Sequence, residues 1–295
     1  MLYDIYLKLL NSFGPQYWWP VTKEGEVAPK YHKSIILNEK QKLEICFGAI
    51  LAQNTNWRNA EKAIINLNKN KLIDIKKIKN IKNKKLALII KSSGYHNQKA
   101  KKLKNFCNFL LKDYNGSLKK LFKNNIEKLR SGLLSVNGIG PETADSIILY
   151  AAKKPVFVIN AYTKRILNRI GCKEKTYDEL QRLFMQNIPN SEKLFNECHA
   201  LLVELGKSIC KKEPWCKKCP VNNNCDYFKN TWLNMALSIF SIITGAVIIY
   251  LVSMILIHKF FEKIFKMMFF IISAVLAWGN LFSAAERRLI KIFIY

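Results

Sequence analysis

Four closely spaced cysteines could hold a metal group. They are Cys210, Cys216, Cys219 and Cys225. Four thiolates on one loop can bind either a [4Fe–4S] cluster or a tetrahedral zinc ion, and the central C-x2-C spacing is compatible with both. Because the cysteines would supply every protein ligand, no position stays open for a substrate. The spacing therefore predicts a structural metal site in residues 210–225.

A second group of residues could bind phosphate. Gly138, Ile139 and Gly140 interrupt an apolar turn, and Pro141 suits the first position of the helix that follows. A hairpin of this kind turns unpaired backbone N–H groups and a helix N-terminus toward solvent. These groups together form a site for one phosphate.

An apolar run after this hairpin leads to a polar helix cap. Residues 155–159 read Pro-Val-Phe-Val-Ile, and Asn160 follows them directly. Asparagine is a preferred N-cap residue, so a helix is predicted over 161–170. Asp145 is the nearest carboxylate along the chain, and its spacing from Glu142 places both on one face of the hairpin helix.

The surrounding sequence shows helical spacing almost throughout, which predicts an all-α domain. Residues 59–129 and 177–206 repeat apolar positions at helical spacing, and no convincing period-two strand appears. Residues 43–51 form a buried helix that ends at Gln53, within a polar cluster. The aromatic residues 17–19 could stack on nucleic-acid bases, although packing of their loop onto the core is the favoured interpretation.

Charge is distributed unevenly along the 295 residues. The net charge is +27, and 42 basic against 19 acidic residues leave residues 1–230 with +23. A positive domain of this size attracts polyanions, with nucleic acid first and an anionic membrane second. The hydrophobic content of 49% is high enough to form a core, so disorder does not explain the charge.

The other cysteines are expected to be ordinary core thiols, because apolar residues surround them. They are Cys46, Cys107, Cys172 and Cys198. The first residues lack the basic start and apolar core of a signal peptide. We therefore expect a reducing compartment, in which cysteines bind metal or stay free rather than form disulfides.

The C-terminal part, residues 231–295, differs sharply in composition. Residues 232–257 form an apolar run of 26 residues without a charge, and 267–285 form a second uncharged run. The first exceeds the ~20 residues that span a bilayer, so a membrane hairpin is predicted around the basic segment 258–266. The second run could instead be re-entrant or interfacial, and the whole tail could be a fused neighbouring reading frame.

Several motifs resemble one known protein family. These are FGPQYWWP (13–20), FGAILAQNTNWRNAEKAI (47–64), GYHNQKAKKL (94–103), LLSVNGIGPETADSI (133–147) and the cysteine tail. In this order they are similar to the endonuclease III superfamily of helix-hairpin-helix DNA glycosylases, especially the endonuclease III-related group that includes the 3-methyladenine DNA glycosylases. The likeness covers roughly residues 10–229. It implies a two-lobed, all-α glycosylase domain over 1–229.

The resemblance also implies roles for single residues. Asn160 stands where the family has its catalytic aspartate, and Glu142 stands where glycosylases with lyase activity have a lysine. Without that amine no Schiff base can form, so the expected reaction is monofunctional, with water as nucleophile. The implied DNA-binding residues are Gln53, Gly138, Ile139, Gly140 and Thr143. Asp145 has no family role in the reaction.

The resemblance favours a [4Fe–4S] cluster over Zn2+ at the four cysteines, although the first gap is one residue shorter than in endonuclease III. The expected function is excision of a damaged base, such as an alkylated purine, from double-stranded DNA by a monomer. This domain would lie in the cytoplasm, anchored by the membrane hairpin. The alternative is a catalytically weakened or silent, membrane-tethered DNA-binding homologue, because Asn160 replaces the aspartate.

Overall fold

The computed structural model describes residues 1–292, and the side chains up to Trp278 except that of Asn234. Two compact units, Met1–Phe228 and Lys229–Tyr295, divide the chain. This division lies close to the boundary predicted from composition. Within residues 1–292 the only β-pairing is an isolated bridge between Val21 and Lys30, which confirms the all-α prediction.

The first unit consists of helices joined by short turns. Its α-helices are α1 (Leu2–Phe13), α2 (Glu39–Leu51), α3 (Trp57–Lys69), α4 (Ile75–Asn80), α5 (Asn83–Ile89), α6 (His96–Tyr114), α7 (Leu118–Phe122), α8 (Ile126–Leu134), α9 (Pro141–Ser146), α10 (Ala161–Ile170), α11 (Tyr177–Asn187) and α12 (Glu192–Ser208). Short helical turns are η1 (Lys91–Ser93), η2 (Ile147–Ala151), η3 (Cys216–Lys218) and η4 (Asn222–Asn224).

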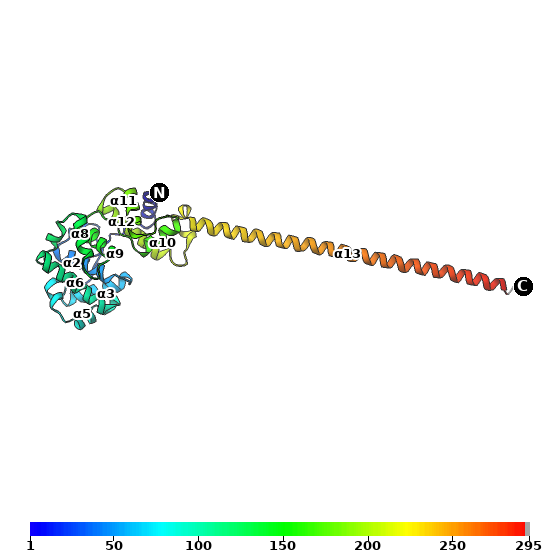
Figure 1. Cartoon of the computed structure of the whole chain (residues 1–295), viewed down its shortest axis with the longest axis horizontal. Helices are drawn as coiled ribbons and strands as arrows, with labels where there is room; N and C mark the ends of the chain where they lie inside the picture. Colours follow the sequence, from blue (N-terminus) through cyan, green and yellow to red (C-terminus); the bar gives the residue numbers. More distant parts are fainter. Residues whose placement is uncertain (293–295) are drawn as a thin grey trace. The chain divides into compact units, whose positions relative to one another are not determined.

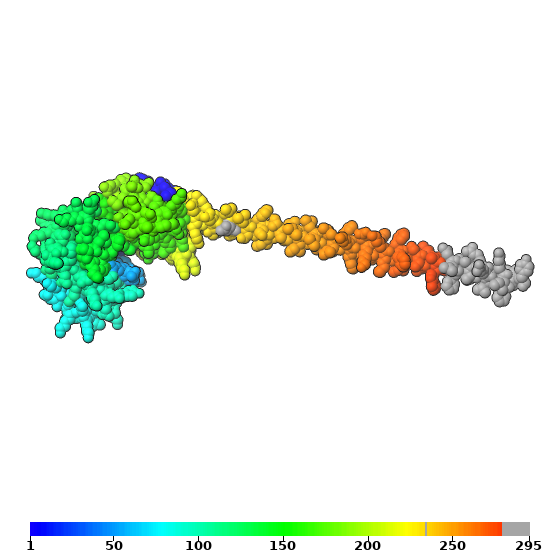
Figure 2. All heavy atoms as spheres, viewed as in Figure 1, coloured from blue at the N-terminus to red at the C-terminus, as the bar shows by residue number. Residues whose placement is uncertain are grey.

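The N-terminal helix packs beside the last helices of this unit. α1 contacts α11 and α12, and α12 also contacts α10, whereas α2 packs against α3, α6 and α7 (Figure 1). In Figure 2, α1 is visible only as a small dark-blue patch among atoms from the later part of the chain. The turn η2 contacts both α2 and α12, so it links the two groups of helices.

The predicted hairpin lies between α8 and α9. Gly138 has a φ of 98°, a conformation that glycine adopts without strain, and Pro141 is the first residue of α9. A Cβ on Gly138 would also lie 2.4 Å from Cγ of Lys102. Glycine is therefore required here for two reasons, its backbone conformation and the close approach of Lys102.

The C-terminal tail differs from the predicted hairpin of two spans. One continuous helix, α13 (Asp226–Ile292), runs through 232–257, 258–266 and 267–285. No glycine or proline occurs in 246–278 to break the helix, and Lys266 pairs with Glu262 one turn away at 2.8 Å. Residues 258–266 therefore continue the helix and form no turn.

Length and composition alone would allow one helix among the described residues to cross a membrane. It comprises Asp226–Trp278, with a mean hydropathy of 2.5 in its most apolar window, none of which is buried.

Candidate functional site

Asn160 caps α10 and is almost completely buried. The apolar residues Val156–Ile159 before it lie in the core, which fixes the backbone from which its side chain leaves. Its Oδ1 accepts hydrogen bonds from the backbone N of Thr163 at 2.9 Å and from the Thr163 hydroxyl at 3.2 Å. Only 9% of Asn160 is exposed. The predicted helix cap is confirmed, and the cap fixes which way the amide oxygen points.

The nitrogen side of the Asn160 amide faces His199 on α12. Asn160 Nδ2 lies 3.0 Å from His199 Nε2, and His199 Nδ1 lies 2.5 Å from the Tyr150 hydroxyl on η2. An amide nitrogen can only donate, so Nε2 accepts and a neutral ring carries its proton on Nδ1. Sequence analysis did not select His199 or Tyr150. His199 is 39 residues from Asn160, and no spacing rule joins them.

Burial lowers the pKa of His199 from 6.5 to about 4. The unfolded chain therefore binds one more proton than the folded chain between these values. This contributes stability that is complete above pH 6.5 and is lost as the pH falls toward 4. The loss amounts to about 3 kcal/mol for a shift of this size.

We expect His199→Gln to remove this pH dependence. Urea denaturation of the full-length protein in detergent, followed by tryptophan fluorescence, measures the free energy of unfolding at pH 7 and pH 4.5. The advantage of the wild type over the variant should shrink by about 2–3 kcal/mol between the two. An advantage that stays constant would contradict a neutral, buried His199.

An aromatic cluster lies against Tyr150. The Trp19 ring centroid is 5.1 Å from that of Tyr150 and 5.1 Å from that of Trp57, and Trp18 contacts both tryptophans. A Cβ on Gly48 would lie 3.0 Å from Trp19, so α2 approaches this ring closely. Trp18 and Trp19 pack against the core, as the favoured interpretation of residues 17–19 predicted.

Gln53 joins the end of α2 to the hairpin. Its Nε2 donates to the Gly138 carbonyl at 3.0 Å and to the Thr143 hydroxyl at 2.8 Å, while its Oε1 accepts from Lys102 at 2.5 Å. The structure thus brings together three of the predicted DNA-binding residues. Thr143 and Ile139 are buried, whereas Gly140 is exposed. In this structure Gln53 braces the hairpin through contacts within the chain.

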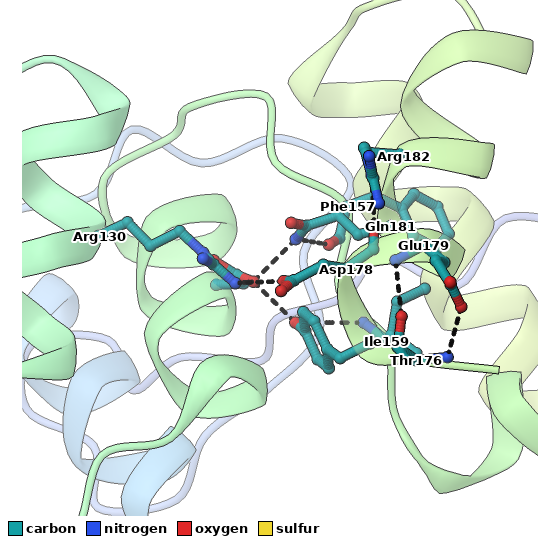
Figure 3. Close-up of polar contacts among 10 residues, drawn as sticks. Arg130, Phe157, Ile159, Thr176, Asp178, Glu179, Gln181 and Arg182 are labelled. Atoms are coloured by element: carbon teal, nitrogen blue, oxygen red, sulfur yellow. Dashed lines mark hydrogen bonds and ion pairs between the residues drawn. The ribbon is translucent and has the colours of Figure 1, made fainter. Parts of the chain in front are cut away.

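Asp145 is fully buried and accepts hydrogen bonds from three side chains. Two of these partners, Arg130 and Gln181, are labelled in Figure 3. Arg130 on α8 donates from Nε to Oδ1 at 2.8 Å and from Nη2 to Oδ2 at 3.2 Å. Tyr177 and Gln181 on α11 each donate to Oδ2 at 2.8 Å. Burial, followed by the nearby carboxylate, raises the pKa of Tyr177, which therefore stays protonated as a donor. Four hydrogen bonds hold Asp145 as a paired carboxylate.

This network joins the hairpin helix to the segment before Asn160. Gln181 also donates to the carbonyl of Phe157 at 2.7 Å, and the backbone N of Ile159 lies 3.5 Å from the Tyr177 hydroxyl. The prediction that Glu142 and Asp145 share a face is wrong, because Glu142 is exposed while Asp145 turns toward α8 and α11. Residues three apart in sequence lie about 60° apart around a helix. In the six-residue helix α9 this angle is enough to leave Glu142 in solvent while Asp145 enters the interior.

The four C-terminal cysteines lie in the loop between α12 and α13. All of Cys210, Cys216, Cys219 and Cys225 are half-buried and free of disulfides. Cys225 donates through Sγ to the Arg169 carbonyl at 3.3 Å, and Arg169 Nη1 lies 3.2 Å from Cys210 Sγ. Burial, together with the charges of the other three cysteines, raises the pKa of the Cys219 thiol to about 11.

These residues fit a four-thiolate group by the chemistry of their donors. The neighbouring cysteines raise the pKa of the Cys216 and Cys219 thiols, so the loop brings these sulfurs near one another. The Arg169 guanidinium would offset part of the negative charge of the thiolates. Among the described side chains, no three histidine, cysteine or acidic residues converge at metal-binding distance. The remaining cysteines (46, 107, 172 and 198) are buried, as predicted for core thiols.

Comparison with known proteins agrees with this architecture. Residues 47–190 match the family described as HhH-GPD superfamily base excision DNA repair protein. A Methanocaldococcus jannaschii protein, provisionally named a DNA repair glycosylase, is 39% identical over 229 residues, which are 76% of this chain and 96% of that protein. Endonuclease III of Thermotoga maritima is 28% identical over 68% of this chain and 88% of its own length.

Solved structures show the same fold. The 3-methyladenine DNA glycosylase of H. pylori, bound to 1,N6-ethenoadenine, has a TM-score of 0.54 and 30% identity over 70% of this chain and 95% of its own. An endonuclease III–DNA covalent intermediate has a TM-score of 0.61 at 19% identity, over 78% of this chain and 97% of its own. The second likeness concerns the fold alone.

Proposed function

Because this chain belongs to the HhH-GPD superfamily of base excision DNA repair proteins, we propose that it is a monofunctional DNA glycosylase. In this proposal a monomer hydrolyses the N-glycosidic bond of a damaged base that has left the duplex, since that bond is inaccessible in stacked DNA. The structural relative bound to 1,N6-ethenoadenine supports a modified purine, such as an alkylated one, as the base.

The observation that carries this proposal is the shared support of the hairpin and Asn160. Asp145 on the hairpin helix binds the same Gln181 that holds Phe157, three residues before Asn160. A backbone phosphate bound at Gly138, Ile139 and Gly140 would therefore sit in fixed geometry to residue 160. Contacts of this type position DNA without reading its sequence.

The side chains near residue 160 determine which reaction the site can support. Cleavage of the glycosidic bond builds positive charge on the sugar, which a nearby carboxylate would stabilise. Asn160 offers a neutral amide there, and Asp145 is already paired with Arg130. Glu142 supplies no amine for a covalent step. The chain is therefore suited to slow attack by water without lyase chemistry.

The alternative function is DNA binding without excision. Both functions need the hairpin, and only excision needs chemistry at residue 160. Purified full-length protein in detergent should be incubated with duplexes that carry single lesions, including 1,N6-ethenoadenine and 3-methyladenine, and with undamaged duplex. Release of one damaged base supports the glycosylase. Tight binding with no release from any lesion, at protein in excess over DNA, supports the silent homologue.

The four cysteines are proposed to hold a [4Fe–4S] cluster, which would stabilise the loop between α12 and α13. The donor set of four free thiols beside Arg169 supports this proposal. The lysines next to the cysteines (211, 212, 217 and 218) would offset the thiolate charge and could contact phosphates.

Protein purified without oxygen is expected to be brown and to contain about four irons per chain, because one such cluster contains four. Metal analysis and visible absorption measure this. Cys219→Ser should lose iron, whereas Cys172→Ser, at a buried cysteine outside the loop, should retain it. One zinc per chain without visible absorption would instead support the zinc site.

The tail is proposed to anchor the protein to a membrane, with the glycosylase domain in the cytoplasm. The long uncovered apolar surface of Asp226–Trp278 supports this. The positive-inside tendency does not choose an orientation, because Lys259, Lys263 and Lys266 compete with basic residues at 287–291.

Full-length protein is expected to sediment with membranes during ultracentrifugation and to become soluble only in detergent. The matched control is a chain ending at residue 228, the last residue of the first compact unit. It should remain in the supernatant. Full-length protein that stays in the supernatant without detergent would contradict membrane insertion.

A further inference from the structure

Three buried side chains from three separate elements form one hydrogen-bonded chain. Asn160 precedes α10, His199 lies within α12, and Tyr150 lies on η2, with exposures of 9%, 7% and 1%. The chain runs from the Thr163 backbone N through both ends of the Asn160 amide to the imidazole and then to the phenol. Nothing in the proposed reaction so far uses His199 or Tyr150.

The Thr163 backbone N–H fixes the direction of every hydrogen bond from Asn160 to Tyr150. The Thr163 N–H can only donate, so the atom of Asn160 that faces it must be oxygen and the atom that faces His199 must be nitrogen. Nε2 then accepts, and Nδ1 donates to Tyr150. A carboxylate at position 160 would reverse this order, because it cannot donate. It would require a proton on Nε2, and the Tyr150 hydroxyl would then donate to Nδ1.

We propose that His199 is the positioning residue for the side chain at position 160, and that the His199–Tyr150 pair reverses its hydrogen bonds when that side chain is a carboxylate. The proposal rests on the proposed function in one respect, that residue 160 lies at the reaction centre. Either tautomer leaves all three polar groups paired. The same buried site can therefore hold a neutral or a charged side chain without moving the helices.

Few other ionisable groups are close to the hydrogen-bonded residues Asn160, His199 and Tyr150. Burial raises the pKa of Tyr150 well above 10, so its hydroxyl keeps its proton in both arrangements. Burial alone lowers the pKa of His199, and no ion pair involves it among the described residues. On α12, Glu197, Cys198 and Glu192 also raise the pKa of Tyr150, and Glu197 accepts from the backbone N of Gln16. The Phe157 ring lies edge-on to the imidazole, with the two ring centroids 6.4 Å apart.

The protonated ring nitrogen can be observed directly. Full-length protein in detergent, labelled with 15N only in histidine, contains four histidines, and His199→Gln identifies the signal of interest. At neutral pH the wild type should show a proton on Nδ1 and none on Nε2. Asn160→Asp should show a proton on Nε2. Tyr150→Phe removes a partner of Nδ1 but leaves the contact with Asn160, so the wild-type tautomer should persist.

A wild type with its proton on Nε2 would overturn the proposal, as would the same tautomer in wild type and Asn160→Asp. Because this measurement needs no DNA, it is independent of the proposed function. Protein that never excises a base but shows the expected reversal refutes the function alone.

A kinetic measurement tests the consequence for the reaction. In Asn160→Asp, a hydrogen bond from His199 to the carboxylate should favour its charged form. Adding His199→Leu should move the acid limb of the single-turnover rate upward by about 1–2 pH units, the size expected for one hydrogen bond to a charged group.

Adding His199→Gln should move the acid limb less, because its side-chain amide can still donate to the carboxylate. His96→Gln, a substitution at a half-buried histidine that takes no part in these hydrogen bonds, should not move the acid limb. An acid limb that is the same in Asn160→Asp with and without His199→Leu would show that His199 has no positioning role.

Discussion

Asn160→Asp is expected to raise the single-turnover rate of base excision by about 10²–10³-fold, the usual effect of one electrostatic group in a dry site. The new carboxylate would face the positive charge that develops on the sugar and could also accept a proton from water. The helix cap should survive, because an aspartate oxygen can still accept from the Thr163 backbone N. Rates are measured with enzyme in excess over a lesion-containing duplex.

The matched control is Asn168→Asp, which adds the same charge to the exposed far part of α10. It should leave the excision rate unchanged, and both variants should bind undamaged duplex about as well as the wild type or slightly more weakly. Intact mass must first show that Asn160 has not deamidated. If unmodified wild type excises as fast as Asn160→Asp, another group carries the chemistry, and the exposed Glu142 becomes the residue to test.

Arg130→Met is expected to lower the free energy of unfolding by about 3–5 kcal/mol, because it leaves a buried carboxylate without its counter-charge. Asp145 is fully buried and has no other ion-pair partner among the described residues. Urea denaturation of the full-length protein in detergent measures the effect. Arg182→Met, at an exposed arginine whose Nε donates to the Asp178 carbonyl, should change stability by about 0.5 kcal/mol or less.

A second substitution separates charge from packing. Asp145→Leu in the Arg130→Met background removes the unpaired charge, so part of the lost stability should return. A double variant that is less stable than Arg130→Met would show that the network contributes mainly through its hydrogen bonds to Tyr177 and Gln181. Arg130→Met with wild-type stability would contradict the buried ion pair itself.

The sequence alone determined the local structure around the site. Gly138 and Pro141 marked the hairpin, and Asn160 marked the start of α10, because turns and helix caps depend on a few consecutive residues. The all-helical architecture and the burial of the scattered cysteines followed from apolar spacing in the same way. Family resemblance then suggested a role for residue 160 in the reaction, which no spacing rule contains and which remains a prediction.

Only the tertiary structure decided which side chains meet. Gln53 lies 85 residues from Gly138, and His199 lies 49 residues from Tyr150, yet each pair is in hydrogen-bond contact. Apolar spacing says which face of a helix is buried but not which helix covers it. For the same reason the sequence could not show that the Asp145 carboxylate forms an ion pair with Arg130. In the tail, composition suggested a turn at 258–266, but the structure has a continuous helix there. No glycine or proline interrupts this part of the chain.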